Sequence, residues 1–329
     1  MTGRIESLRG RLKNRLEVRV VAAAMSLAVA AGCGESTAPQ DEPLVIDRHE
    51  KIPGDVVKGT PQNDRHPPVL HSTEFLEPVP VPVISTAGAE DSPFIPADGS
   101  DLYFFFAADV RQDASIQVRD PVNGIWVSRH VGGAWQEPAL VQLQERDELA
   151  LNGCPWVLGN EMLFCSAREG FAGIHWFRAD RVGGRWQNWA IVEYPAEYDV
   201  GELHIHGDRL YYGSARPGGQ GGQDIWMLTR AGAGWTNPMN VAAVNTAGDE
   251  TRPFVARGGQ ELWITRWYQG TPAIFRSKLL DGQWQEAELI VSRFAGEPTL
   301  DAQGNVYFVH HFFVDGVMIE ADIYVAYRK

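Results

Sequence analysis

Apolar residues along this 329-residue chain come in short runs separated by turns, without the period of about 3.6 residues that marks amphipathic helices. One position recurs as an Ile followed by an aromatic residue or a His, and its copies are 49, 51, 49 and 49 residues apart. A second position recurs, with nearly the same period, as a Trp that stands two residues after a Gly in three copies and directly after a Gly at Trp235. The two sets are Ile125, Ile174, Ile225, Ile274 and Ile323, and Trp135, Trp186, Trp235 and Trp284. Most of the chain is therefore one repeated unit.

Each unit is expected to hold four short strands. An apolar hairpin precedes the Ile and turns at pairs such as Asp98-Gly99 and Gly159-Asn160, whose residue types favour tight turns. The Ile position makes the third strand, and the stretch after the Gly-x-Trp makes the fourth. Four strands in a period of this length are typical of a β-propeller blade. The sequence predicts an all-β fold, a five-bladed β-propeller.

The N-terminal side of the repeats supplies one additional strand. The fifth unit has no fourth strand of its own after Ile323. The segment that begins at Phe75 aligns without gaps, at a constant offset of 160, with the segment that begins at Trp235. We therefore expect residues 75–86 to complete the last blade and close the ring. The prolines of this segment suit an edge strand, because one side of such a strand makes no hydrogen bonds to the sheet.

Residues 1–32 have the features of an export signal. A basic stretch precedes an apolar run of 12 residues, 20–31, which is too short to span a bilayer. The run leads into Ala30-Ala31-Gly32-Cys33, which resembles the lipobox of bacterial lipoproteins. The resemblance implies cleavage before Cys33 and acylation of Cys33, and several acyl chains anchor a protein stably. The alternative is ordinary secretion, with Cys33 incidental.

The stretch 33–72 is polar and rich in Pro, and it shows no hydrophobic period. We expect it to be a flexible tether that joins the lipid anchor to a propeller over residues 73–329. Gly34 stands where an Asp retains enteric lipoproteins in the inner membrane, so we expect attachment to the outer membrane of the cell envelope. The formal net charge of −13 argues against a nucleic-acid partner, which requires a basic face.

Two stretches carry a family resemblance. Residues 214–226 are Ser-Ala-Arg-Pro-Gly-Gly-Gln-Gly-Gly-Gln-Asp-Ile-Trp, and residues 249–253 are Asp-Glu-Thr-Arg-Pro. Both resemble the WD40-like repeats of bacterial envelope propellers of the Tol type. The resemblance covers about residues 75–329 and implies the propeller fold. It implies no particular activity, because propellers support both binding and catalysis.

Ligands of propellers bind where the loops that enter the innermost strands converge, and most of the polar residues near those entries are acidic. Converging carboxylates could bind a cation or a sugar, or act as acid and base. The alternative is a structural role, in which they cap turns and pair with neighbouring Arg side chains. The candidate ligand-binding residues are Glu90, Asp91, Asn152, Glu202, Glu250, Arg252 and Glu297.

Hydrolysis of a glycan would use two carboxylates that flank the scissile bond, as in the inverting glycosidases with five-bladed propellers. Asp91, Glu202 and Glu297 are the candidates for such chemistry. The second unit offers Asn152 and Cys154 where an acid would be needed, so no catalytic residue is predicted.

Neither a metal nor a cofactor is expected from the sequence. His204 and His206 share one face of a strand, but no third ligand stands nearby. Cys154 and Cys165 flank the Gly159-Asn160 turn symmetrically, which would place them directly opposite each other. They are candidates for a disulfide in the oxidising envelope, with two buried thiols as the alternative.

The preferred interpretation is a monomeric envelope propeller, anchored in the membrane through a lipidated Cys33, that binds a protein, a peptide or a glycan without catalysis. One alternative is a glycan-active hydrolase that uses carboxylates at the propeller mouth. Another is an accessory lipoprotein of a larger envelope assembly.

Overall fold

The computed structural model describes residues 46–145, 147–256 and 258–329, and within these ranges the chain is nearly all β. Its helices are single turns: η1 (His49–Lys51), α2 (Ala114–Gln117) and η2 (Ala196–Tyr198). No helix in these ranges is long and apolar enough to cross a membrane. The predicted signal, residues 1–32, and Cys33 lie outside the described residues.

The first two repeats form antiparallel groups of strands. In the first, β3 (Ala89–Phe94), β4 (Asp101–Ala107) and β5 (Gly124–Val131) pair in order, and β5 also pairs with the short β6 (Ala134–Trp135) and β7 (Ala139–Leu140). In the second, the order is β8 (Ala150–Leu158), β9 (Glu161–Arg168), β10 (His175–Val182) and β11 (Arg185–Val192).

The third and fourth repeats have the same plan. The third contains β12 (Leu203–His206), β13 (Arg209–Ser214) and β14 (Asp224–Ala231), with β15 (Gly234–Trp235) and β16 (Met239–Asn240) both paired to β14. The fourth contains β17 (Glu250–Val255), β18 (Glu261–Tyr268), β19 (Thr271–Leu280) and β21 (Glu288–Ser292). In that group β20 (Gln283–Trp284) pairs with β19, and β1 (Val69–Leu70) is added outside β21.

The last group is completed from the N-terminal side of the chain. It contains β22 (Ala295–Leu300), β23 (Val306–Val314) and β24 (Val317–Ala326), and β2 (Val79–Pro80) pairs with the outer side of β24. The register places Val79 opposite Val325, and an isolated bridge joins Phe75 to Arg328. The prediction that residues 75–86 supply the outermost strand of the last sheet is confirmed, although only short parts of that segment pair.

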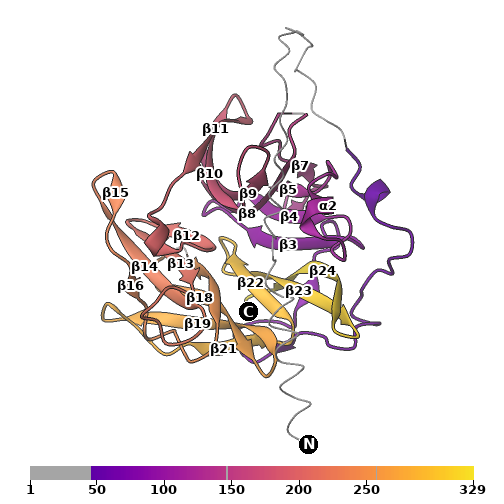
Figure 1. Ribbon diagram of the computed structural model, residues 1–329. Helices are drawn as coiled ribbons and strands as arrows, with labels where there is room; N and C mark the ends of the chain where they lie inside the picture. Colours follow the sequence, from indigo (N-terminus) through magenta and orange to yellow (C-terminus); the bar gives the residue numbers. More distant parts are fainter. Residues whose placement is uncertain (1–45, 146, 257) are drawn as a thin grey trace, which may run out of the picture.

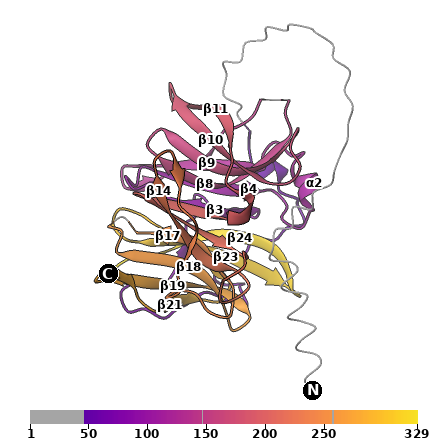
Figure 2. The same cartoon turned by 60° about the vertical axis from the view of Figure 1, so that its left-hand side comes forward.

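The groups surround a shared centre. The innermost strands contact one another in a closed ring, β3 to β8, β8 to β12, β12 to β17, β17 to β22 and β22 back to β3. One parallel bridge, Ala321 to Ala89, also joins the last group to the first. Figures 1 and 2 show the strand groups placed around this centre, with the yellow C-terminal strands next to the purple β3. The arrangement is that of a β-propeller.

The repeated Trp residues pack between neighbouring groups. Trp126, Trp176, Trp186 and Trp226 are buried. Three of the Gly-x-Trp side chains lie against a Tyr in the second strand of the preceding group, which joins adjacent sheets edge to face. These pairs are Trp186–Tyr103, Trp284–Tyr211 and Trp135–Tyr307, with ring centroids 6.5, 6.2 and 5.9 Å apart.

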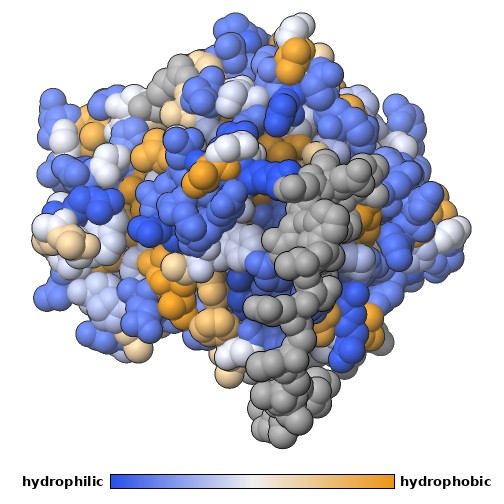
Figure 3. All heavy atoms as spheres, turned by 90° about the horizontal axis from the view of Figure 1, so that it is seen from above, coloured by the Kyte–Doolittle hydropathy of each residue, from blue (hydrophilic) through white to orange (hydrophobic). Residues whose placement is uncertain are grey.

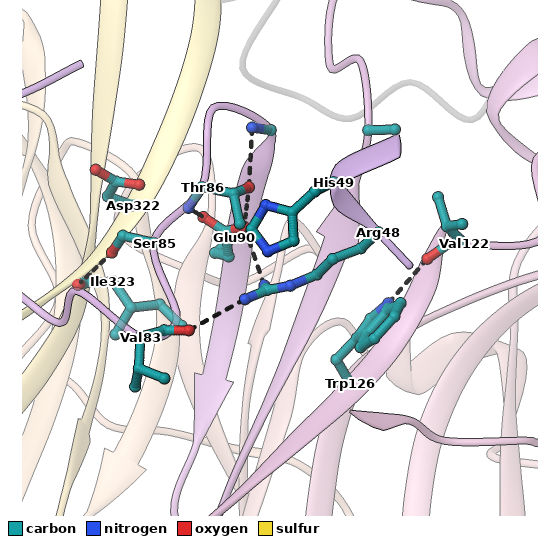
Figure 4. A network of polar contacts seen from close by, with 12 residues as sticks. Arg48, His49, Val83, Ser85, Thr86, Glu90, Val122, Trp126, Asp322 and Ile323 are labelled. Atoms are coloured by element: carbon teal, nitrogen blue, oxygen red, sulfur yellow. Dashed lines mark hydrogen bonds and ion pairs between the residues drawn. The ribbon is translucent and has the colours of Figure 1, made fainter. Parts of the chain in front are cut away.

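Residues 46–72, here called the strap, make specific contacts with the propeller. Arg48 is 2 % exposed, and its guanidinium lies 3.3 Å from Oε1 of Glu90 and donates to the carbonyl of Val83 at 3.2 Å (Figure 4). Three aromatic rings surround the same cation at 5.6 to 5.7 Å, and they belong to Phe104, Phe106 and Trp126. This part of the expected tether 33–72 therefore has a buried anchoring residue on the propeller.

Two further strap residues reach buried groups of the last sheet. Nζ of Lys58 lies 2.5 Å from carboxylate oxygens of both Glu320 and Asp322, which are almost fully buried. The Asp64 carboxylate lies 2.8 Å from Nε2 of His310. Polar residues thus hold the strap, and for this reason its sequence shows no hydrophobic period.

Candidate functional site

A local distortion recurs on four of the innermost strands. Ser92, Cys154, Arg252 and Glu297 all have a left-handed backbone, with φ between 50° and 57°, and each is followed by a Pro. The pairing register shifts at each of these places, as in a β-bulge. Such bulges redirect a side chain, and left-handed backbone at residues other than Gly gathers at functional sites.

The bulged residues lie around one small cavity. The third repeat contributes Glu202 at the equivalent position, directly before Leu203 instead of a Pro. We call this set the polar ring: Ser92, Cys154, Glu202, Arg252 and Glu297. The cavity that these residues line has a volume of about 60 Å³, which is room for about two water molecules. It is too small for a sugar ring.

Aromatic side chains close the propeller centre beside the polar ring. They stand two residues further along four of the same strands and are buried: Phe94, Trp156, His204 and Phe254. Their rings contact one another, with centroids 4.6 Å apart for His204 and Phe254 and 6.5 Å apart for Phe94 and Trp156. We call this set the aromatic plug.

Arg252 connects two acids of the polar ring. Its Nε lies 2.8 Å from Oε2 of Glu202 and 2.5 Å from Oε1 of Glu297. Because both contacts end on one nitrogen, these carboxylate oxygens are closer together than the about 6.5–9.5 Å that separates the two acids of inverting glycosidases.

Burial and charge set the protonation of this ion-paired group. Burial raises the pKa of Glu297 well above its usual range; Arg252 opposes that rise, and the nearby Asp91 and Glu202 add to it. Burial likewise raises the pKa of Glu202. Burial works against the charge of Arg252, yet the surrounding carboxylates raise its pKa, so the guanidinium stays protonated.

Three predicted site residues lie outside the polar ring. Glu90, Asn152 and Glu250 are at most 3 % exposed and stand two positions earlier on their strands than Ser92, Cys154 and Arg252. They do not line the cavity, so the structure does not bring these side chains together with the polar ring.

Hydrogen bonds explain why these residues are buried. The Glu90 carboxylate accepts bonds from the backbone N–H and the hydroxyl of Thr86, and Glu250 accepts the same two bonds from Thr246. Asn152 accepts bonds from the Ser166 hydroxyl and from Arg168. These side chains satisfy buried turns, which is the structural alternative considered for them.

Asp91 lies next to the polar ring without lining the cavity. Its carboxylate, one carboxylate oxygen of Glu297 and one ring nitrogen of His311 all lie within 4.8 Å of one another. Sequence reasoning placed no role on Ser92 or His311, and it considered Cys154 only as a disulfide partner and an argument against catalysis. The sequence does mark the bulged positions, because a residue followed by Pro recurs at the same place in four repeats.

The two cysteines of the second repeat are close but not directly opposite. Cys165 pairs with Gly153, because the bulge moves Cys154 out of the ladder. Both are free thiols, and Cys165 Sγ donates to Cys154 Sγ at 2.8 Å, longer than the about 2.05 Å of a disulfide. The hydrogen bond with Cys165, together with burial, raises the pKa of Cys154 well above its usual value.

The histidines of β12 do not form a metal site with each other. His204 belongs to the aromatic plug, and burial lowers its pKa to about 3. His206 lies at the turn, partly exposed and close to Gly259.

Comparison with known proteins gives similarity at the level of structure alone. No protein-family model and no curated protein matches the chain. Similar solved structures include an endo-arabinase from Bacteroides thetaiotaomicron, with 14 % identity and a TM-score of 0.48 over 76 % of this chain and 97 % of the other. A gluconolactonase from Xanthomonas campestris has 13 % identity and a TM-score of 0.42, over 80 % and 95 % of the two chains. A putative TolB from Agrobacterium tumefaciens has 13 % identity and a TM-score of 0.40, over 75 % and 79 %. The assignment of a β-propeller therefore rests on the strand pairing described above and not on these similarities.

Proposed function

We propose that the chain is a lipid-anchored, five-bladed β-propeller of the cell envelope that binds a protein, peptide or glycan and catalyses no reaction. The blade count is supported by the strand groups, each with one innermost strand in the ring formed by β3, β8, β12, β17 and β22. A lipid anchor at Cys33 is supported by the sequence resemblance described above.

The ion pairs of Arg252 carry the proposal that the site binds rather than catalyses. A general acid and a general base must be free to exchange protons with substrate or water, whereas Glu202 and Glu297 are both held by one guanidinium. The cavity is also too small to enclose a sugar ring, so a glycan could contact the polar ring only from outside it. These observations favour binding over the alternative, a glycan-active hydrolase.

The accessible part of the polar ring suits a polar ligand. The side chain of Glu202 is 32 % exposed and that of Arg252 is 25 % exposed, so both can contact a group that approaches from outside the cavity. A guanidinium and a carboxylate side by side offer both hydrogen-bond donors and acceptors. On the face shown in Figure 3, hydrophobic residues form small patches among hydrophilic ones. The exposed parts of Glu202 and Arg252 are what favour a polar group on the partner.

In this proposal the short segment between Cys33 and the strap limits how far the propeller can lie from the membrane. Only 12 residues, 34–45, separate Cys33 from the first described residue, Ile46. Fully extended, they span about 40 Å. A lipidated Cys33 would keep the propeller close to the bilayer, and partners embedded in or attached to the same membrane would be within reach.

Two measurements test the proposal. Metabolic labelling with a fatty acid should label the wild-type chain, and Cys33→Ser should carry no label; equal labelling of both would reject the anchor. Incubation with envelope polysaccharides should release no reducing ends. A release that Glu297→Gln abolishes would support the hydrolase and reject the non-catalytic role.

A further inference from the structure

Three side chains from three strands converge beside the polar ring. Asp91 is on β3, Glu297 is on β22 and His311 is on β23, and each offers one ligand atom within 4.8 Å of the other two. His311 is 6 % exposed and Glu297 is 7 % exposed. Rigid strands hold all three, which is how proteins place a fixed coordination set.

The imidazole of His311 is oriented as in metal-binding histidines. Its Nδ1 lies 3.2 Å from the carbonyl oxygen of Phe294, so Nδ1 carries the hydrogen and donates it. Nε2 then has a free lone pair, and among the described residues the structure gives it no hydrogen-bond partner. A ligating His almost always donates its other N–H to a carbonyl or a carboxylate in this way.

The carboxylates of Asp91 and Glu297 lie close together beside a single guanidinium. One oxygen of each lies within 4.8 Å of the other, and two carboxylates at this separation favour a shared proton or a positive ion beside them. Arg252 is the cation nearest to these two carboxylates, and it also forms an ion pair with Glu202. Three acids therefore share one guanidinium in a mostly buried site, and a bound cation would balance the excess negative charge.

We propose that Asp91, Glu297 and His311 bind one divalent transition-metal ion of the Zn²⁺ type. Two carboxylate oxygens and one imidazole nitrogen are ligands that such an ion accepts, and three protein ligands leave a further position for water or a ligand group. Ca²⁺ and Mg²⁺ prefer sets made only of oxygen, so the imidazole selects against them. The inference contradicts the sequence expectation of no metal, and it does not rest on the proposed binding role.

The test is titration of the full-length chain, purified in detergent and stripped with a chelator, with Co²⁺ as a spectroscopic probe. We expect one Co²⁺ per chain with visible absorption bands, displaced by Zn²⁺ and not by an excess of Ca²⁺. Asp91→Asn and His311→Asn should each weaken Co²⁺ affinity at least about tenfold, which is the lower end of the effect of removing even an outer partner.

Control variants separate this site from other possible ligands. His206→Asn changes a His outside the cluster, and Cys165→Ser removes one of the two thiols of the nearby cysteine pair; both variants should bind Co²⁺ as the wild type does. Circular dichroism should show that each variant is folded. The proposal is overturned if the folded wild type binds no stoichiometric Co²⁺, if only Ca²⁺ binds, if Asp91→Asn and His311→Asn retain full affinity, or if Cys165→Ser abolishes binding.

Discussion

The Nε atom of Arg252 lies 2.5 Å from Oε1 of Glu297, at the centre where the innermost strands meet. Both residues stand at the same repeat position on β17 and β22, and both have a left-handed backbone before a Pro. Repetition of one strand therefore brings two unlike side chains into contact between neighbouring innermost strands. The ion pair joins two strands and leaves the partly exposed face of the guanidinium available to a ligand.

Loss of the central cation should destabilise the propeller. Arg252→Met leaves Glu297 buried without its cation, and removing one partner of such a pair costs about 3 kcal/mol or more. Arg111→Met is the matched control, because Arg111 pairs with Asp55 and Asp109 nearer the surface and should cost about 1 kcal/mol or less. Urea unfolding of the two variants should differ accordingly, and equal losses would contradict the role given to Arg252.

The buried contact of the strap predicts a rescue. Arg48→Met should lower the free energy of unfolding by about 3 kcal/mol and expose the strap to protease, because Glu90 remains buried without the cation. Adding Glu90→Gln removes that uncompensated charge and should recover part of the loss. If Arg48→Met is as stable and as protease-resistant as the wild type, the strap does not depend on this residue.

Two adjacent residues test closure of the last sheet. Phe75 is 1 % exposed and packs edge to face on Trp263, whereas Leu76 is 50 % exposed. Phe75→Ala should cost about 3–5 kcal/mol in a urea unfolding experiment. Leu76→Ala should change stability by less than about 0.5 kcal/mol. Similar effects of both substitutions would mean that the N-terminal strand does not hold the ring closed.

His204 should make stability depend on pH. In the folded chain burial keeps its pKa at about 3, whereas the unfolded chain protonates it near 6.5. The unfolded state then binds one more proton, so this residue lowers stability as pH falls from 6.5 towards 3, by up to about 1.4 kcal/mol per pH unit. His204→Phe, compared with the wild type at pH 7.5 and 5.5 by urea unfolding, should lack this loss. Parallel changes in both proteins would show that His204 is protonated when folded.

A disulfide between Cys154 and Cys165 remains a prediction, and thiol titration can test it. The two sulfur atoms are 2.8 Å apart, so small movements suffice for a disulfide in an oxidising compartment. Protein isolated from the envelope without reductant and then unfolded should show no reactive thiol at Cys154 or Cys165. Two free thiols per chain would establish the reduced pair as the stable form.

The repeat made the architecture predictable, since an Ile and a Gly-x-Trp every 49 to 51 residues require one strand plan. The constant offset between the segments at Phe75 and Trp235 also located the closing strand. The same repeat places Arg252, Glu202 and Glu297 at one position, directly before Pro253, Leu203 and Pro298.

The missed features depend on geometry that a pattern of residue types does not contain. A bulge shifts Ser92 and Cys154 towards the axis and leaves Asn152 behind in the sheet, so counting along the strand selects the wrong residue. Arg48 anchors the strap. An Arg in a polar stretch is expected to be exposed to solvent, and the aromatic rings that surround it come from distant parts of the chain. His311 and Asp91 belong to different repeats and are far apart in the sequence, so no spacing between neighbouring residues predicts that they lie close together.

The central claim is that the polar ring is a binding site without catalytic activity, and capture from an envelope extract tests it most directly. Immobilised wild-type chain is compared with the folded double variant Glu202→Gln/Glu297→Gln and with Glu193→Gln/Glu286→Gln, in which two exposed acids far from the ring are changed. We predict that the wild type and the control capture the same protein or glycan and that the ring variant captures at least about tenfold less, a loss of about 1.4 kcal/mol in binding free energy. Equal capture by all three chains would contradict the account.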